Sequence, residues 1–179
     1  MVNRSIFGMV LALILLISCS LEQEAMLAPR SLEFPDLQMG NATYVLGRSG
    51  ETPLSVHAES IAIYQKTNQA ELEHLVFEQR DKEGNSLLSG SADQARVNTT
   101  TYDAELFGNI VVHKTDENFT IEAENLTWNH DKQILKSDGD ALVKVMFDES
   151  NTIEGMGFFG DLQNGTYEFS LLLQGVIRQ

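Results

Sequence analysis

Four segments of this chain repeat one short pattern at an almost constant spacing. Each places an apolar residue two positions before a small one, in Val56-His57-Ala58, Leu88-Ser89-Gly90, Ile121-Glu122-Ala123 and Ile153-Glu154-Gly155. The small residues follow one another at intervals of 32, 33 and 32 residues. Residues two apart lie on one face of a β-strand, and a fixed period of this length indicates stacked units. The repeat therefore predicts a sheet built from similar units.

Each repeat unit also carries a second apolar run of strand length. These runs cover residues 75–77, 106–112, 142–147 and 167–173. Apolar runs separated by turn residues roughly every 8–12 positions are typical of an all-β sandwich, barrel or roll. We therefore predict an all-β fold of two-strand units, stacked about four times. Residues 69–79 fit either a helix or a strand, and we predict a strand.

The face that carries apolar residues changes within two of the repeats. Ile121 and Ala123 stand at odd positions, whereas Leu126 and Trp128 stand at even positions. The apolar residues within 153–162 change from odd to even positions in the same way. A β-bulge near residues 125 and 158 would return all of these side chains to one buried face. The alternative is that both faces of these strands are partly covered.

The first 19 residues have the parts of a bacterial lipoprotein signal in the right order. A short, positively charged start precedes an uncharged run over residues 6–17, and Leu16-Ile17-Ser18-Cys19 forms a lipobox. We expect cleavage before Cys19, acylation of its thiol, and a periplasmic protein held on a membrane by lipid. The alternatives are an uncleaved transmembrane anchor, for which the apolar run is short, or an ordinary secretory signal.

The order of these segments predicts one folded domain behind a tether. We expect residues 1–18 to be the signal peptide, 19–40 a lipid-anchored tether and 41–179 the β-domain. The tether holds two of the three prolines, and Cys19 is the only cysteine, so no internal disulfide can form. Apolar burial and backbone hydrogen bonds must therefore stabilise the domain.

Charge and side-chain chemistry exclude several classes of function. The formal net charge of -14 argues against nucleic acid as a partner and against binding of anionic head groups. The four histidines are dispersed without the spacing of metal ligands, and no serine sits in a nucleophile motif. We therefore predict no enzyme activity, no metal site and no cofactor, with an extracytoplasmic hydrolase ranked last among the alternatives.

Several motifs in a common order make residues 44–177 resemble a known family. They are Gly90-x-Ala92-x-x-Ala95, Leu106-Phe107-Gly108-Asn109-Ile110-Val111-Val112, Thr120-Ile121-x-Ala123-x-x-Leu126, Ser137-Asp138-Gly139 and Ile153-x-Gly155-x-Gly157-Phe158-x-Gly160-Asp161-Leu162. In order and spacing the chain resembles the LptC family of periplasmic lipopolysaccharide-export proteins. Related bridge and outer-membrane proteins that share the same domain fit the motifs as well.

The resemblance implies a β-jellyroll that is open along one side, with an apolar groove for acyl chains. It also implies that the protein receives lipopolysaccharide, or a similar acylated lipid, from an inner-membrane ABC transporter. The lipid would then pass to a periplasmic LptA-like bridge protein that docks on the C-terminal strand. Many family members keep an uncleaved N-terminal helix, which a lipobox replaces here. By analogy we favour the outer leaflet of the inner membrane, with the outer membrane as the alternative.

Two sets of residues carry these expectations. The candidates for the groove are Phe77, Phe107, Trp128, Phe147 and Phe158. The candidates for the docking strand are Phe169, Leu171, Leu172, Leu173, Val176 and Ile177. For each aromatic residue the alternative is ordinary core packing, and for the strand it is an ordinary buried strand. A structural lipoprotein that binds envelope proteins through its sheet edges, without carrying lipid, is the second candidate function.

Overall fold

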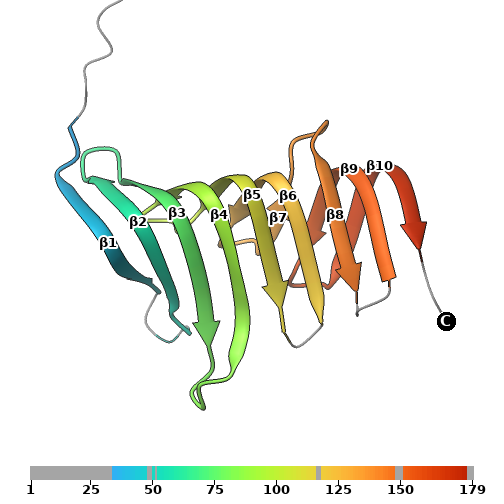
Figure 1. Cartoon of the computed structure of the whole chain (residues 1–179), viewed down its shortest axis with the longest axis horizontal. Helices are drawn as coiled ribbons and strands as arrows, with labels where there is room; N and C mark the ends of the chain where they lie inside the picture. The colour runs from blue at the N-terminus through green and yellow to red at the C-terminus, as the bar shows by residue number, and fades with distance from the viewer. Residues whose placement is uncertain (1–33, 48–49, 51, 116–117, 148–150, 177–179) are drawn as a thin grey trace, which may run out of the picture. The chain divides into compact units, whose positions relative to one another are not determined.

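The repeated two-strand units form one antiparallel β-sheet (Figure 1). The structure is a computed structural model that describes residues 34–47, 50, 52–115, 118–147 and 151–176. Within these ranges the chain forms ten strands and no helix, which confirms the predicted all-β class. All the described residues except Phe34 belong to one compact unit, residues 35–179.

The strands follow one another along the sheet in nearly the order of the sequence. They are β1 (Leu37–Leu46), β2 (Leu54–Tyr64), β3 (Gln69–Arg80), β4 (Ser86–Asn98), β5 (Ala104–Lys114), β6 (Phe119–Asn129), β7 (Ile134–Lys136), β8 (Leu142–Phe147), β9 (Asn151–Asp161) and β10 (Thr166–Val176). Both β7 and β8 pair with β6 on one side and β9 on the other. Together they occupy a single strand position, interrupted at residues 137–141. The four predicted units are thus β2–β3, β4–β5, β6 to β8 and β9–β10, with β1 added in front.

Alternating side chains explain why these segments form strands. In β2, Val56 and Ala58 are buried while Ser55 and His57 are exposed. In β3, Leu72 and Leu75 are buried between exposed charged and polar residues, so the predicted strand over residues 69–79 is confirmed. Such alternation suits a sheet with one face on a core.

Most odd-numbered strands contain a residue in the left-handed conformation near their middle. These residues are Asn41 (φ 47°) in β1, His74 (48°) in β3, Gly108 (71°) and Asn109 (45°) in β5, and Gly157 (62°) in β9. Residues other than glycine rarely adopt positive φ. Their recurrence shows that each of these strands bends at a fixed point.

The strand pairings align these points in one line across the sheet, which we call the crease. The residues opposite them are Glu59 in β2, Asp93 in β4, Glu124 in β6, the interruption at 137–141 and Ser170 in β10. At the crease the sheet folds over itself into two layers, seen as the front and back strand segments in Figure 1. Each long strand contributes one part to each layer.

The two layers are defined by the part of each strand on either side of the crease. Layer 1 comprises residues 42–46, 54–58, 75–80, 86–92, 110–114, 119–123, 142–147, 151–156 and 171–176. Layer 2 comprises residues 37–40, 60–64, 69–73, 94–98, 104–107, 125–129, 134–136, 158–161 and 166–169. The buried residues of β6 and β9 change from odd to even positions between the two layers. In β6, Ala123 of layer 1 and Leu126 of layer 2 are both buried, and in β9 Gly155 of layer 1 and Phe158 of layer 2 are both buried. The buried positions therefore change near residues 125 and 158, as they do in the sequence, but the β-bulges predicted there are not found in β6 and β9. The register shift beside β6 lies in β5, between Phe107 and Ile110. Strand β9 stays in register with β10 from Met156 to Phe158.

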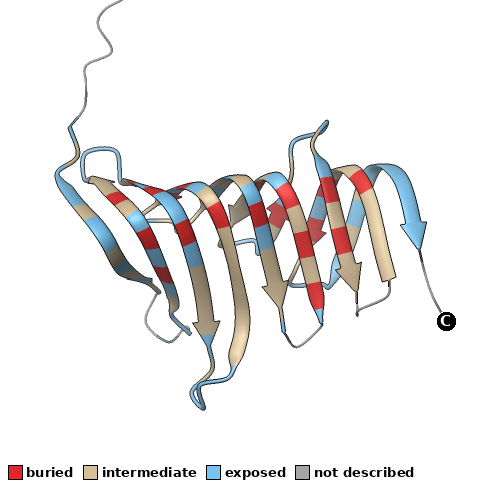
Figure 2. Ribbon diagram, viewed as in Figure 1, coloured by how far each residue is buried: buried red, intermediate tan, exposed pale blue. Residues whose placement is uncertain are grey.

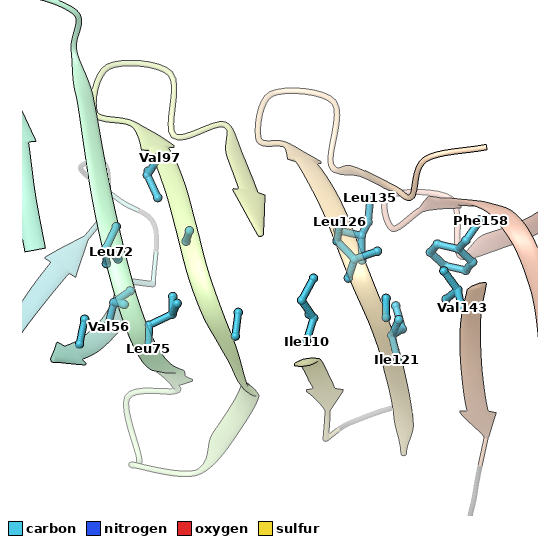
Figure 3. Close-up of a cluster of buried hydrophobic side chains, with 14 of the residues drawn as sticks. Val56, Leu72, Leu75, Val97, Ile110, Ile121, Leu126, Leu135, Val143 and Phe158 are labelled. Carbon is cyan, nitrogen blue, oxygen red and sulfur yellow. The ribbon is translucent and has the colours of Figure 1, made fainter. Parts of the chain in front are cut away.

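A single apolar core lies between the layers (Figures 2 and 3). Its buried residues are Val56, Ala58, Ile61, Ala70, Leu72, Leu75, Ala92, Ala95, Val97, Ile110, Phe119, Ile121, Ala123, Leu126, Leu135, Val143, Val145 and Phe158. No polar or charged residue is buried within the described part of the chain. Burial is concentrated on the central strands, whereas β1 and β10 contribute no fully buried residue.

The folded unit begins earlier than the sequence suggested. Residues 37–40, which we expected to belong to the tether, pair with β2 from Leu37 opposite Ile63 to Gly40 opposite Ser60. The expected signal peptide and Cys19 lie outside the described residues. Within the described ranges, no helix has the length and apolarity needed to cross a membrane.

Candidate functional site

The interior differs between the two ends of the sheet, the N-terminal half, β1 to β5, and the C-terminal half, β6 to β10. The buried side chains of the N-terminal half are aliphatic and small, such as Ala58, Ile61 and Leu72. Phe77 is half-buried and lies over Gly90, its partner on β4. A Cβ on Gly90 would collide with the Phe77 ring, so the repeated small residue makes room for an aromatic ring of the neighbouring strand.

The C-terminal half, β6 to β10, is filled by five rings that we call the aromatic cluster: Phe119, Phe147, Phe158, Tyr167 and Phe169. The ring centroids lie 5.1 Å apart for Phe119 and Phe147, and 5.4 Å apart for Phe158 and Phe169. Tyr167 lies 4.7 Å from Phe119, 6.1 Å from Phe147 and 6.3 Å from Phe158. Such tilted and stacked pairs contribute about 0.5–1.5 kcal/mol each beyond their burial.

Gly155 repeats the arrangement of Gly90 in this half. A Cβ on Gly155 would lie 2.6 Å from Cδ1 of Phe169 and 2.7 Å from the carbonyl oxygen of Leu171. The small residue therefore again lies beneath the ring of a neighbouring strand.

The structure brings four of the five groove candidates to the interior. Phe77, Trp128 and Phe147 are half-buried and pack on the core, and Phe158 is 1% exposed. Phe107 does not join them: it is 39% exposed and pairs with Gln94 and Asn125. Successive residues of a strand face opposite sides of the sheet, and here Leu106 is the residue that packs on the core.

The strand expected to dock a partner is β10, at one end of the sheet. Within the described residues it pairs with β9 alone. Leu171, Leu172, Leu173 and Val176 are 54%, 60%, 49% and 48% exposed, while Phe169 packs on the core. Ile177 lies outside the described residues. A strand with one unpaired edge and exposed apolar side chains is a template for strand addition.

Sequence reasoning missed three features of these surfaces. The first is β1, the other edge, where Leu37 is 48% and Val45 58% exposed. The others are Phe119 and Tyr167, which complete the aromatic cluster. Alternation in residues 119–123 and 167–169 was a usable signal, since Phe119 has the parity of Ile121 and Tyr167 that of Phe169.

The histidines are held by separate local contacts. Nδ1 of His57 lies 3.3 Å from Oγ1 of Thr43, Nδ1 of His113 lies 2.9 Å from Oγ1 of Thr120, and the His130 ring packs on Tyr102. No group of three metal-ligating side chains occurs among the described residues. An open depression of about 600 Å³ lies over β1 to β5 and is lined mainly by outward-facing side chains, among them His57 and His113.

Two carboxyl groups with lowered pKa values belong to hairpin turns. The side-chain amide of Asn85 donates to Asp81, and that of Asn164 donates to Asp161, and these bonds lower the pKa of each carboxyl below its usual 3.8. The nearby backbone N–H groups add to the effect. Both carboxylates therefore stabilise turns.

Comparison with known families agrees with this geometry. The family described as "Lipopolysaccharide-assembly, LptC-related" matches residues 8–177, nearly the whole chain. The chain belongs to this family. Membership implies a role in lipopolysaccharide transport in the periplasmic part of the cell envelope. A comparison with individual curated proteins found no match. The resemblance inferred from the motifs is thus confirmed for this LptC-related protein.

Proposed function

We propose that this LptC-related protein is a membrane-anchored carrier that receives lipopolysaccharide or a related acylated lipid from an inner-membrane ABC transporter. It passes the lipid to a β-jellyroll bridge protein. The observation that supports this function best is the apolar interior between the layers, in which no described polar or charged residue is buried. Acyl chains are apolar, so such an interior favours them over any polar ligand.

The half-buried aromatic residues are the first contacts we assign to the lipid. Phe77, Trp128 and Phe147 border the core but keep part of their surface exposed. A chain that entered between the layers would meet these rings before the buried aliphatic residues. Phe158, at 1% exposure, would be reached only after the layers separate.

The head group is expected to stay outside the sheet. The outer face carries charged pairs such as Lys144 with Glu122, 3.0 Å apart, and Arg96 with Glu105, 3.1 Å apart. With a net charge of -14 for the chain, a phosphate would be repelled unless cations bridge it. Solvent exposure of the head group fits a carrier that recognises the acyl part.

The unpaired edge of β10 is the proposed docking strand for the bridge protein. Its exposed leucines would be covered when a partner strand pairs with it, since strand addition supplies main-chain hydrogen bonds and side-chain contacts together. The proposed anchor is an acylated Cys19, which would hold the protein at the outer leaflet of the inner membrane.

Photo-crosslinking in living cells tests this function. A photo-reactive amino acid is placed at Phe147 or Phe77 for the interior, at Leu172 for the edge, and at Phe107 as an outward-facing control. We expect lipid adducts at the two interior positions, protein adducts at Leu172 and no lipid at Phe107. Protein adducts alone, with no lipid at any position, would instead favour a structural lipoprotein that binds partners through its edges.

A charge within the interior provides a second test. Phe147→Asp should abolish lipid capture, because an unpaired carboxylate is costly to bury beside an acyl chain. Phe107→Asp is the matched control on the outward face and should leave capture unchanged. Capture that persists in a folded Phe147→Asp protein would contradict lipid binding between the layers.

A further inference from the structure

The ends of the two layers opposite the crease form a boundary that we call the seam. In layer 1, Phe119 is the first residue of β6, at the end of the strand away from the crease, and it pairs with Lys114 of β5 and Phe147 of β8. In layer 2, Tyr167 lies one residue from the start of β10 and pairs with Gly160. Both residues are therefore far from the crease, and their rings stack at 4.7 Å.

Contacts within the aromatic cluster divide into two kinds. Phe119 and Phe147 are cross-strand partners within layer 1, and Phe158 and Phe169 are cross-strand partners within layer 2. The ring contacts between layers, 4.7 Å to Phe119 and 6.1 Å to Phe147, both belong to Tyr167. Among the described rings, Tyr167 alone joins the layers at the seam.

The crease contains fewer main-chain pairs than the strands on either side. The pairing of β5 shifts between Phe107 and Ile110 where it passes β6. Between β6 and β9 the strand is interrupted, and side chains take over: the N–H of Asp138 donates to Oδ1 of Asn125 at 2.8 Å. Between β5 and β4, the side-chain amide of Asn109 donates to Oδ2 of Asp93 at 2.8 Å. Side-chain contacts of this kind allow a change of angle at lower cost than a continuous ladder does.

The ring contacts that join the layers, from Tyr167 to Phe119 and to Phe147, lie in the C-terminal half. In the N-terminal half, Phe77 lies over Gly90, its cross-strand partner in layer 1. The stacking of Tyr167 therefore joins the layers at the end of the sheet next to the exposed edge strand β10.

We propose that the seam between Tyr167 and the pair Phe119–Phe147 is a gate through which acyl chains pass, with the crease as its hinge. Tyr167 is the residue that holds the gate closed. This inference rests on the proposed function, because it assumes that lipid lies between the layers. It adds that passage takes place near β10, where a partner could stabilise the open form.

Cysteine accessibility tests the gate without any lipid. The chain from Ser20 onward contains no cysteine, and it is exported behind an ordinary signal peptide that replaces residues 1–19. A single cysteine is introduced at Val145, 1% exposed and close to the gate in β8, or at Ala58, 0% exposed and in the N-terminal half. The measured quantity is the rate at which a small thiol reagent reacts with each position.

In the Tyr167→Ala background we expect the reaction at Val145→Cys to accelerate about tenfold, since stacked pairs at this boundary contribute on that scale. The reaction at Ala58→Cys should change less than about twofold, because local opening leaves other regions protected. Tyr167→Phe keeps the ring, so its rate at Val145→Cys should stay closer to that of the unmodified protein than to that of Tyr167→Ala. Phe169→Ala is the matched control, since the ring contact of Phe169 stays within layer 2. This substitution should not accelerate the reaction at Val145→Cys more than the reaction at Ala58→Cys.

Two results would contradict the proposal that Tyr167 holds the seam closed. Equal acceleration at both cysteines in Tyr167→Ala would show that the substitution acts through global unfolding. An unchanged rate at Val145→Cys would show that Tyr167 does not hold the seam closed. Because no lipid is present in this experiment, either result is separate from a failure of the crosslinking test of lipid transport.

Discussion

The two halves of the interior share one architecture but are filled differently. The fully buried side chains of the N-terminal half, β1 to β5, are all aliphatic or small, whereas the C-terminal half, β6 to β10, adds five aromatic rings in mutual contact to its aliphatic residues. Both halves retain the repeated small residue beneath a ring, at Gly90 and at Gly155. The repeat therefore specifies how two neighbouring strands pair, whereas the large side chains determine where the two layers contact each other through aromatic rings.

The largest expected effect lies in the aromatic half. Phe158→Ala should lower the free energy of unfolding by about 3–5 kcal/mol, because it removes a buried ring and leaves a cavity. The conservative Ile61→Val in the aliphatic half should cost only about 0.5–1.5 kcal/mol. Urea unfolding monitored by circular dichroism measures both. A cost below about 1 kcal/mol for Phe158→Ala would show that the aromatic cluster is loosely packed.

The next effect tests what the halves have in common. Gly90→Ala and Gly155→Ala should each cost about 1–3 kcal/mol, because the added methyl group collides with a ring and a carbonyl oxygen. Gly139→Ala is the control, since a Cβ there meets nothing within 4 Å. The same unfolding experiment compares the three variants. If Gly90→Ala matches Gly139→Ala, the small residue is not required beneath Phe77.

A smaller effect is expected from the charged outer face. Lys144→Met removes the pair with Glu122 in the C-terminal half, and Arg96→Met removes the pairs with Glu71 and Glu105 in the N-terminal half. These groups are partly exposed, so each change should cost about 0.2–1 kcal/mol. The cost should shrink when unfolding is repeated in high salt, which screens exposed charges. A cost that is independent of salt would indicate lost packing of the side-chain stems.

The smallest effect concerns the hairpin turns, one in each half. The pKa of Asp81 and that of Asp161 are lowered from 3.8 by the asparagine amides that bond them. A carboxyl with a lowered folded pKa contributes stability above its unfolded pKa and loses it as the pH falls through the folded value. Asp81→Asn and Asp161→Asn should therefore melt slightly below the unmodified protein near neutral pH, and this difference should shrink as the pH falls below 3.8 through the lowered folded pKa.

Thermal unfolding at a series of pH values measures this difference. The two turns should behave alike, because the same kind of bond stabilises each carboxylate. A melting difference that grows as the pH falls would contradict this account of the turns.

Much of the local structure was predictable from the sequence. Strands form wherever side chains alternate, as over Gln69–Arg80, because a period of two is a property of neighbouring residues. The change of the buried residues from odd to even positions near residues 125 and 158 was visible in the sequence for the same reason. Assignment of β10 as the C-terminal edge followed from the resemblance to the LptC family.

Other parts of the candidate site were not predictable from local pattern. Leu37 to Gly40 carry a weak alternation, and only their pairing with β2 makes them part of the sheet. Phe107 looked like a groove residue because it is aromatic, yet the bend at Gly108 and Asn109 leaves Leu106 facing the core instead. The positive-φ residues likewise belong to strands that look regular in sequence.

The sequence alone determined the all-β class, the two-strand unit, the family and the expectation of a lipidated Cys19, because each depends on residue order over short distances. The tertiary structure alone decided which aromatic side chains share the interior and that Tyr167 meets Phe119 across the layers. Those residues are 48 positions apart in the sequence, and no local pattern encodes their contact. It arises only when the crease folds the sheet and brings the ends of the two layers together.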